Sequence, residues 1–273
     1  MADTNTPLDQ ALEAYSDLLV RTITNLIYLD PPQNMRTPLM PHELYKLIES
    51  EPPRTRANRL GRRLDGKDWP CFAHSMAGYQ RLTNLAKCVR QVMKDDVPGD
   101  FIETGVWRGG ACILMRGISR AGGQGHRKVF VADSFEGLPP PDVENYPQDA
   151  GDKHYLLKHV LGISQEIVEA NFQAYDLLDE NVVFMKGWFK DTLPTLKDDD
   201  QFSIVRLDGD MYESTIQAIE ILYPKLSAGG YLIVDDYGAV RACKVAIDEY
   251  REKNGITDTL HQIDWTGAYW RKS

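Results

Sequence analysis

Residues 100–110 read DFIETGVWRGG, and this stretch decides the fold. A short apolar strand runs into a turn with three glycines, and a helical pattern begins at about residue 109. Glycine lets the backbone approach a ligand closely, at the carboxyl end of the strand where open α/β sheets bind ligands. Because Glu103 precedes the first glycine and the spacing is not GxGxxG, the loop suits an ammonium group better than a pyrophosphate. The alternative is a glycine turn that only packs a helix on a strand.

The alternation of strand and helix continues along the chain. Strands are predicted at 100–106, 128–133, 181–186, 202–207 and 230–234, and helices at about 109–120, 155–173, 189–197, 213–226 and 239–253. Near-continuous apolar strands that alternate with helices indicate a parallel sheet covered on both faces. Residues 261–265 and 268–271 flank Thr266-Gly267, which predicts a terminal hairpin that adds antiparallel strands to one edge.

The composition changes near residue 85. Apolar residues recur at the helical period between Tyr15 and Asp30, which predicts an amphipathic helix. Residues 31–70 then hold seven prolines and a run of arginines between 54 and 63. This basic stretch could be an anion or nucleic-acid site, but the nearby acidic residues favour a solvated loop. We therefore expect a dependent N-terminal helical segment, 1–85, packed on a catalytic domain, 86–273.

The overall composition is that of an ordinary globular protein. The 273 residues are 42% hydrophobic and 26% charged, which excludes intrinsic disorder as the main state. The net charge of −9 argues against a nucleic-acid partner. No apolar run approaches the roughly 18 residues of a membrane span, and the start of the chain lacks the pattern of a signal peptide. The four cysteines form no CxxC pair and indicate reduced thiols in a cytoplasmic protein: Cys71, Cys88, Cys112 and Cys243.

Asp133-Ser134-Phe135 follows the second predicted strand directly. An acidic residue at this strand end commonly accepts hydrogen bonds from the two hydroxyls of a ribose. By itself Asp133 could equally cap a following turn. Together with the glycine loop, it indicates a cofactor that contains adenosine.

Acidic residues also follow the fourth and fifth predicted strands. Asp208-Gly209-Asp210 ends one strand and Asp235-Asp236 ends the other, so their carboxylates should converge at the edge that holds the glycine loop. Like charges so close together are costly unless a cation or a shared proton relieves them. Oxygen ligands without His or Cys suit Mg²⁺. The alternatives are that each Asp caps a helix, or that Asp-x-Asp holds a nucleotide-sugar through a metal, as in glycosyltransferases; the second leaves Glu103 unexplained.

Two further features remain open. Gly187-Trp188 ends the third strand, where an amide and an indole could flank an adenine ring; Trp188 could equally be a core anchor. Among the histidines, His74 could face the cleft, whereas His154 and His159 are expected at the surface of one helix.

The motifs together resemble the macrocin O-methyltransferase family over nearly the whole chain. The similarity is carried by ETGVWRGGA at 103–111, ADSF at 132–135, GWFKDT at 187–192, DGD at 208–210, DDY at 235–237 and the closing YWR. It also covers Arg21-Thr22 with Asn25 in the first helix and AHSM at 73–76. The stretch 31–70 is the least similar. The resemblance implies a class I S-adenosylmethionine-dependent methyltransferase fold, with a mostly parallel seven-stranded sheet, a terminal antiparallel hairpin and an N-terminal helical lid.

The resemblance also implies roles for particular residues. The methionine part of S-adenosylmethionine would lie against Glu103, Thr104, Gly105, Val106, Trp107, Gly109 and Gly110, the ribose against Asp133, Ser134 and Phe135, and the adenine near Gly187 and Trp188. Mg²⁺ would be held by Asp208, Asp235 and Asp236, and Asp208 or Asp210 would be the general base. Homologues are usually dimers, in which the N-terminal helices and a loop, here 136–152, cover the substrate.

The expected function is therefore methyl transfer from S-adenosylmethionine, with Mg²⁺, to a deoxysugar hydroxyl of a glycosylated natural product such as a macrolide or aminocoumarin antibiotic. Two vicinal oxygens could chelate the metal, which lowers the pKa of the bound alcohol. A catechol-type Mg²⁺ methyltransferase shares this logic and stays open. A nicotinamide oxidoreductase is disfavoured because Glu103 would repel a pyrophosphate, and a non-catalytic binding module leaves the Asp cluster unexplained. We expect a cytoplasmic homodimer.

Overall fold

The computed structural model describes residues 6–33, 46 and 51–273. Seven strands form one mixed sheet in the order β3-β2-β1-β4-β5-β7-β6. The strands are β1 (Asp100–Thr104), β2 (Val129–Asp133), β3 (Val182–Lys186), β4 (Phe202–Leu207), β5 (Leu226–Val234), β6 (His261–Gln262) and β7 (Ala268–Arg271). β1 to β5 run parallel, and β7 is antiparallel to both β5 and β6. The predicted parallel sheet with a terminal hairpin is confirmed; β5 starts at Leu226, four residues earlier than expected.

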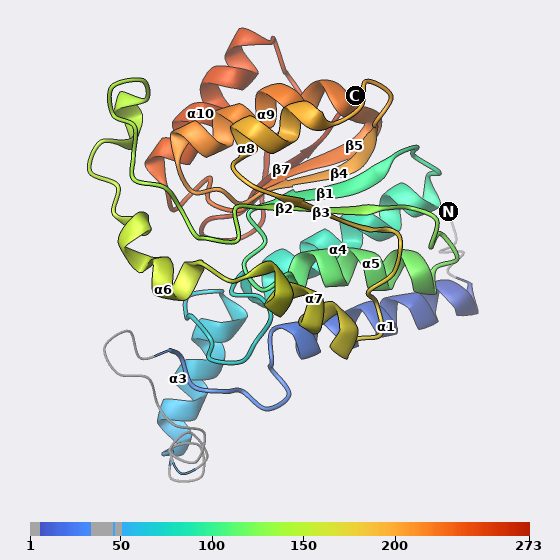
Figure 1. Cartoon of the computed structure of the whole chain (residues 1–273). Helices are drawn as coiled ribbons and strands as arrows, with labels where there is room; N and C mark the ends of the chain where they lie inside the picture. Colours follow the sequence, from blue (N-terminus) through green and yellow to red (C-terminus); the bar gives the residue numbers. More distant parts are fainter. Residues whose placement is uncertain (1–5, 34–45, 47–50) are drawn as a thin grey trace.

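Helices cover both faces of the sheet (Figure 1). One layer contains α1 (Pro7–Ile23), α4 (Gly78–Lys94), α5 (Gly110–Ala121) and α7 (Gln165–Ala174), and the other α8 (Phe189–Thr192), α9 (Tyr212–Lys225) and α10 (Arg241–Lys253). α3 (Pro53–Leu64) and α6 (Lys158–Leu161) lie beyond the sheet, on the left of the view. Three short 3-10 turns complete the described elements: Pro147–Asp149, His154–Leu157 and Leu193–Thr195.

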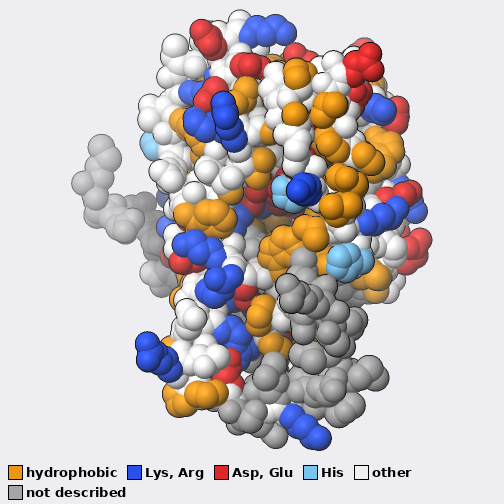
Figure 2. Space-filling view, turned by 90° about the vertical axis from the view of Figure 1, so that its left-hand side faces the viewer, with side chains coloured by type: hydrophobic (Ala, Val, Ile, Leu, Met, Phe, Trp, Pro, Cys, Tyr) orange, Lys and Arg blue, Asp and Glu red, His pale blue; other side chains and the backbone are white. Residues whose placement is uncertain are grey.

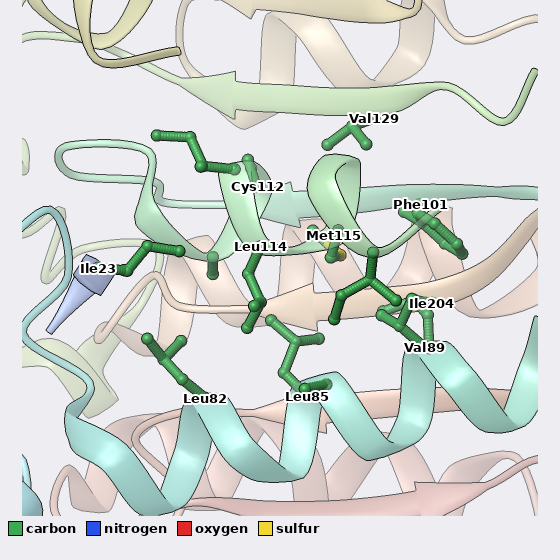
Figure 3. Close-up of a cluster of buried hydrophobic side chains, with 14 of the residues drawn as sticks. Ile23, Leu82, Leu85, Val89, Phe101, Cys112, Leu114, Met115, Val129 and Ile204 are labelled. Atoms are coloured by element: carbon green, nitrogen blue, oxygen red, sulfur yellow. The ribbon is translucent and has the colours of Figure 1, made fainter. Parts of the chain in front are cut away.

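Each face of the sheet buries its own hydrophobic cluster. Figure 3 shows Leu82, Leu85 and Val89 of α4 directed toward Leu114 and Met115 of α5, all fully buried. On the opposite face, α9 and α10 pack a second cluster over β4 and β5, with Trp270 completely buried. Because the sheet is buried on both faces, functional side chains can reach solvent only from the loops at the strand ends.

The first helix lies earlier than the periodicity predicts. α1 begins at Pro7, after a capping box in which Thr6 and Asp9 bond to each other's backbone N–H. It ends at Ile23, because Asn25 and Leu29 adopt positive φ angles of 50° and 52°. The expectation of a helix over 15–30 was therefore wrong at both ends.

The expectation of a solvated loop over 31–70 was wrong at residues 53–64, while 34–45 and 47–50 lie outside the part that the structure describes. Residues 53–64 form α3, and two of its arginines are buried. Arg63, 1% exposed, contacts Asp68 and Asp30 at 2.9 Å each and the carbonyl of Thr24 at 2.9 Å. These contacts fix α3 to the segment after α1, so the charge of Arg63 has a structural role.

Two predicted helices are interrupted. The stretch 155–173 is divided by Gly162, which ends α6, and Ser164 precedes α7. Gly162 has a ψ of 87°, which is not helical, and a Cβ there would lie 2.9 Å from the carbonyl oxygen of Glu136. The stretch 189–197 holds only the four-residue α8 and a 3-10 turn, since Pro194 follows directly.

None of the described helices is long and apolar enough to cross a membrane. The division expected between residues 85 and 86 falls inside α4, whose buried side chains belong to the same cluster as those of α1 and α5.

Candidate active site

A cavity of about 520 Å³ opens at the carboxyl ends of the parallel strands. Figure 2 shows this side of the molecule, with hydrophobic side chains around a central hollow and acidic side chains inside it. The size is typical of a site that encloses a small ligand. Its lining includes aromatic, glycine and acidic residues from several loops, among them Trp69, Gly105, Trp107, Asp133, His154, Gly187, Trp188, Asp208, Asp210, Asp235, Asp236 and Trp265, together with Met76.

The glycine loop is packed against the loop after β4. Gly105 has a φ of +83°, and a Cβ there would lie 1.8 Å from the carbonyl oxygen of Asp208. No other residue type fits this close approach without moving one of the two loops. Gly109, the residue before α5, is in a left-handed conformation with a φ of +81°. The prediction was that the glycines let the backbone approach a ligand; at Gly105 the structure shows close approach to the backbone of Asp208 instead.

Asp133 joins the glycine loop to the loop after β2. Its two carboxylate oxygens accept hydrogen bonds from the backbone N–H groups of Val106 and Phe135, both at 2.7 Å. Burial raises the pKa of Asp133, and these backbone hydrogen bonds oppose the rise. The carboxylate therefore organises both turns while it lines the cavity, so the turn-capping and ligand-binding interpretations are compatible.

Three non-glycine residues with positive φ stand at these strand ends: Trp107 (48°), Phe135 (58°) and Asp210 (60°). Such conformations cost free energy and persist where the surroundings impose them, often at functional sites. Each belongs to a different loop, after β1, β2 and β4. These three strained positions lie at the carboxyl edge of the sheet, whereas the other four described ones lie elsewhere: Asn25, Leu29, Asp96 and Asp176.

Carboxylates converge on this edge as the strand order predicts. Asp208, Asp235 and Asp236 each offer one oxygen within 4.8 Å of the others. None of them caps a helix. The N-terminus of α9 is capped by Asp149, which accepts from the N–H groups of Tyr212 at 2.7 Å and Glu213 at 3.0 Å. The capping alternative is therefore excluded for these three residues.

Two arginines enter the carboxylate cluster, and the sequence reasoning missed both. Arg206 on β4, 2% exposed, contacts Glu103 and Asp235, and Asp208 at 2.6 Å. Arg81 on α4 pairs with the other oxygen of Asp235. The sequence holds one signal for Arg206, because a single arginine inside an apolar strand needs buried acidic partners.

Glu103 lies behind the cavity wall. It is 2% exposed, its Oε1 pairs with Arg206, and its Oε2 accepts a hydrogen bond from the Cys112 thiol at 2.9 Å. Burial raises the pKa of Glu103 to about 7, although the nearby Arg206 lowers it. The Glu103 carboxylate therefore pairs with Arg206 and is not among the groups that line the cavity.

The cluster fits a divalent cation. Asp236 Oδ2 is buried without a hydrogen-bond partner, although buried carboxylate oxygens are normally paired. Burial raises the pKa of Asp236 well above its usual range, and the neighbouring Asp210, Asp208 and Asp235 raise it further. A cation would relieve both the missing partner and the repulsion. The available donors are all carboxylate oxygens, which suit Mg²⁺.

Asp210 is placed beside the cluster, at the cavity wall. Burial raises its pKa to about 7, His154 opposes the rise, and Asp208, Asp235 and Asp152 add to it. A carboxyl group with such a pKa is suited to proton transfer near neutrality.

The histidines differ from expectation. His154 lines the cavity instead of lying on an outer helix surface, and its Nδ1 is 2.7 Å from Asp152 Oδ2. The Asp210 and Asp152 carboxylates raise the pKa of His154 against the effect of burial. His74 is not among the lining residues; its Nδ1 lies 3.0 Å from the Tyr175 hydroxyl. His159 is exposed, as predicted.

The remaining predicted residues divide into two groups. Gly187 and Trp188 line the cavity, and Trp188 is 37% exposed, so it is no core anchor. Ser134 lines the cavity as well. Thr104, Val106, Gly109, Gly110 and Phe135 support the wall without being among the residues that line it. The four cysteines are free, and three of them are buried.

Two tryptophans that line the cavity were not predicted as site residues. Trp69 and Trp265 line the cavity near Arg81 and Asp235, and Trp265 is 43% exposed. The Trp265 indole N–H donates to the carbonyl of Asp65 at 2.7 Å. This contact joins the C-terminal hairpin to the segment after α3, so distant parts of the chain form one wall.

The chain is similar to known proteins over almost its full length. The family of macrocin O-methyltransferases (TylF) matches residues 12–272. Demethyldecarbamoylnovobiocin O-methyltransferase from Streptomyces niveus is 47% identical over 262 residues, 95% of this chain and 93% of the relative. 8-Demethyl-8-(2,3-dimethoxy-alpha-L-rhamnosyl)-tetracenomycin-C 4'-O-methyltransferase from Streptomyces olivaceus is 45% identical, covering 96% and 94%.

A solved structure has the same fold. The structure of the O-methyltransferase NovP superposes with a TM-score of 0.84 at 45% identity, over 96% of this chain and 99% of that one.

Proposed function

The chain belongs to the macrocin O-methyltransferase family, and we propose that it transfers a methyl group from S-adenosylmethionine to one hydroxyl of a deoxysugar on a glycosylated natural product, with Mg²⁺, in antibiotic biosynthesis. The enzyme class and the fold follow from the family. A sugar acceptor is supported by the names of the relatives, one of which includes a rhamnosyl substrate. The observation that carries the metal is the buried, unpartnered Asp236 Oδ2 within a cluster of carboxylates.

The cofactor would occupy the side of the cavity formed by the first three strands. The turn 103–110 would hold the methionine part, with Glu103 acting through Arg206. Asp133, with Ser134 and Phe135 in its turn, would face the ribose. Gly187 and Trp188 would lie beside the adenine. S-adenosylmethionine supplies an electrophilic methyl group on a positive sulfonium.

The metal would be held by Asp208, Asp235 and Asp236. Mg²⁺ held there would act as a Lewis acid that lowers the pKa of an acceptor hydroxyl. Arg206 and Arg81 keep Asp235 in place between them. These two guanidinium groups pair with Glu103, Asp208, Asp235 and Asp264, whereas Asp210 and Asp236 take part in none of these ion pairs. The carboxyl groups therefore outnumber the guanidinium groups, which favours the binding of a cation.

Asp210 is the residue that we assign as general base. It lies beside the metal-binding carboxylates, its side chain makes none of the ion pairs that engage Asp208, and its pKa of about 7 suits proton acceptance. Asp208 remains the alternative base, since both residues precede α9. The apolar part of the wall excludes water, which favours a step that neutralises the sulfonium charge.

The direct test is transfer of labelled methyl groups. The protein is incubated with methyl-labelled S-adenosylmethionine, Mg²⁺ and a panel of macrolide glycosides, aminocoumarin glycosides and simple catechols, with and without EDTA. We expect label on a deoxysugar and its loss with EDTA. Label only on catechols would overturn the sugar assignment, and transfer that persists in EDTA would overturn the metal.

We also propose a cytoplasmic homodimer. The four free cysteines support a reducing compartment, and the exposed Leu8 and Leu18 on α1 support contact with a second copy. Light scattering should give about twice the chain mass; the mass of a single chain would contradict the dimer.

A further inference from the structure

We propose that Trp265 binds the acceptor sugar, by covering the apolar face of its ring while the sugar hydroxyls face the carboxylate cluster. The inference rests on the proposed function and identifies the residue that would select its acceptor. Trp265 and Trp188 are the two exposed tryptophans among the five in the chain, and both line the cavity. Trp188 follows Gly187 at the end of β3, whereas Trp265 lies between β6 and β7, next to Thr266, whose hydroxyl donates to the Asp235 carbonyl.

The Trp265 ring is held in place. Its N–H donates to the Asp65 carbonyl at 2.7 Å, and the Lys67 ammonium lies 5.5 Å from the ring centroid. Both contacts come from the turn after α3, so the only polar atom of the indole already has a partner. The part of the ring that remains exposed is therefore an apolar surface.

The turn that carries Trp265 is tied to the carboxylate cluster. Asp264 accepts from the N–H groups of Thr266 and Gly267 at 3.0 and 2.7 Å, and its other oxygen contacts Arg81 at 3.1 Å. Arg81 in turn pairs with Asp235. The Thr266 hydroxyl donates to the Asp235 carbonyl at 2.9 Å. Of the two sequence neighbours of Trp265, Thr266 is thus bonded to Asp235 directly, and Asp264 is linked to Asp235 through the guanidinium of Arg81.

The packing around this connection is tight. A Cβ at Gly267 would lie 2.9 Å from Arg81 Cδ, and a Cβ at Gly66 would lie 2.3 Å from the Arg81 guanidinium. These two glycines belong to the two turns that form the wall. Arg81 therefore fixes the position of the wall relative to Asp235.

This arrangement selects a particular acceptor chemistry. A sugar whose vicinal hydroxyls face the carboxylates presents its C–H face to the adjoining wall, where Trp265, Trp69 and Met76 offer apolar surface. A deoxysugar has fewer hydroxyls to desolvate against that wall than a fully hydroxylated hexose. Burial of its ring carbons against the indole then adds binding free energy.

The test compares Trp265→Leu and Trp265→Phe with the matched control Trp188→Leu. The acceptor probe is methyl α-L-rhamnopyranoside, whose affinity is measured by saturation-transfer NMR with S-adenosylhomocysteine and Mg²⁺ present. Calorimetry gives the affinity for S-adenosylhomocysteine. We expect Trp265→Leu to weaken rhamnoside binding about tenfold and Trp265→Phe no more than about threefold, since loss of an aromatic contact costs roughly 1 kcal/mol or more.

The two tryptophans should separate the two ligands. Trp265→Leu should leave the affinity for S-adenosylhomocysteine within about twofold of that of the unaltered protein, whereas Trp188→Leu should weaken it by about tenfold. Unchanged rhamnoside binding in Trp265→Leu, or equal loss of both ligands, would overturn the inference alone. If the unaltered protein neither binds the rhamnoside nor methylates any glycoside, the proposed function fails and the inference fails with it.

Discussion

At the scale of single residues, the unpartnered oxygen of Asp236 leads to the sharpest metal prediction. Asp236→Asn keeps the shape of the side chain but removes a charge from the cluster. We expect activity to fall about a hundredfold or more and Mn²⁺ binding, followed by electron paramagnetic resonance, to weaken strongly. Affinity for S-adenosylhomocysteine should persist. Asp248→Asn is the control, because Asp248 is an exposed carboxylate on α10 that pairs with Lys244. Normal Mn²⁺ binding in Asp236→Asn would exclude the assignment.

The raised pKa of Asp210 leads to a prediction about how the stability of the fold depends on pH. Its pKa is raised to about 7 in the folded protein, above the value near 3.9 of an unfolded Asp. The protonated form therefore stabilises the fold below about pH 4, and this contribution is lost as the pH rises through about 7. Asn is a permanently neutral substitute that tolerates the positive φ of this position.

In metal-free buffer, Asp210→Asn should accordingly be more stable than the unaltered protein at about pH 8, by about 1 kcal/mol after allowance for solvent at the cavity wall. The difference should vanish near pH 4. Thermal unfolding in EDTA across this range measures it. A variant less stable at pH 8 would show that burial does not govern this carboxyl.

At the scale of elements, the glycine loop and the loop after β4 are joined at Gly105. Gly105→Ala adds a Cβ 1.8 Å from a carbonyl oxygen at a φ of +83°. Gly123→Ala is a matched control, since Gly123 has a φ of +76° and nothing within 4 Å of its Cβ position. We expect about 1 kcal/mol of destabilisation for Gly123→Ala, from the backbone alone. Gly105→Ala should cost about 3 kcal/mol or more, measured by urea unfolding. Equal costs would mean that the loops separate easily.

Asp149 connects another pair of elements. It belongs to the loop 136–152, which we propose as a cover for the substrate, and its carboxylate caps α9. Burial raises the pKa of Asp149, so the charged cap carries a desolvation cost that its two hydrogen bonds offset. Asp149→Asn should cost about 1 kcal/mol and make the loop more sensitive to protease. Glu144→Gln, at an exposed position of the same loop, should change neither.

The parallel strands could be predicted from the sequence because each is a short apolar run followed by a polar loop. Their shared carboxyl edge then placed Asp208, Asp235 and Asp236 together. The partners of these residues could not be predicted, since Arg81 arrives from a helix 154 positions away from Asp235. The same limit explains why residues 53–64 were predicted as a solvated loop. In the sequence their arginines are typical of an exposed stretch, and only the fold places Asp30 and Asp68 around Arg63.

At the scale of the whole molecule, the N-terminal segment is part of the cavity. The turn after α3 contributes Gly66 and Trp69 to the wall, and it holds Trp265 through Asp65. Arg108 of the glycine loop contacts the carbonyl of Ala73 at 2.9 Å. The segment 1–85 is thus expected to depend on the catalytic domain, as we propose, and the acceptor side of the cavity requires both.

Arg63 gives the test of this dependence. Arg63→Met leaves Asp30 and Asp68 buried without their cation, which typically costs about 3–5 kcal/mol. If that cost is confined to the contact between α3 and α1, the cavity wall that contains Trp69 and Trp265 should become less ordered while the sheet stays folded. We therefore expect the KM for a methylated glycoside to rise about tenfold or more, while the affinity for S-adenosylhomocysteine changes little. Arg56→Met, at an exposed position of the same helix, is the control. Equal loss of both ligands would instead show that α3 stabilises the entire fold as one cooperative unit.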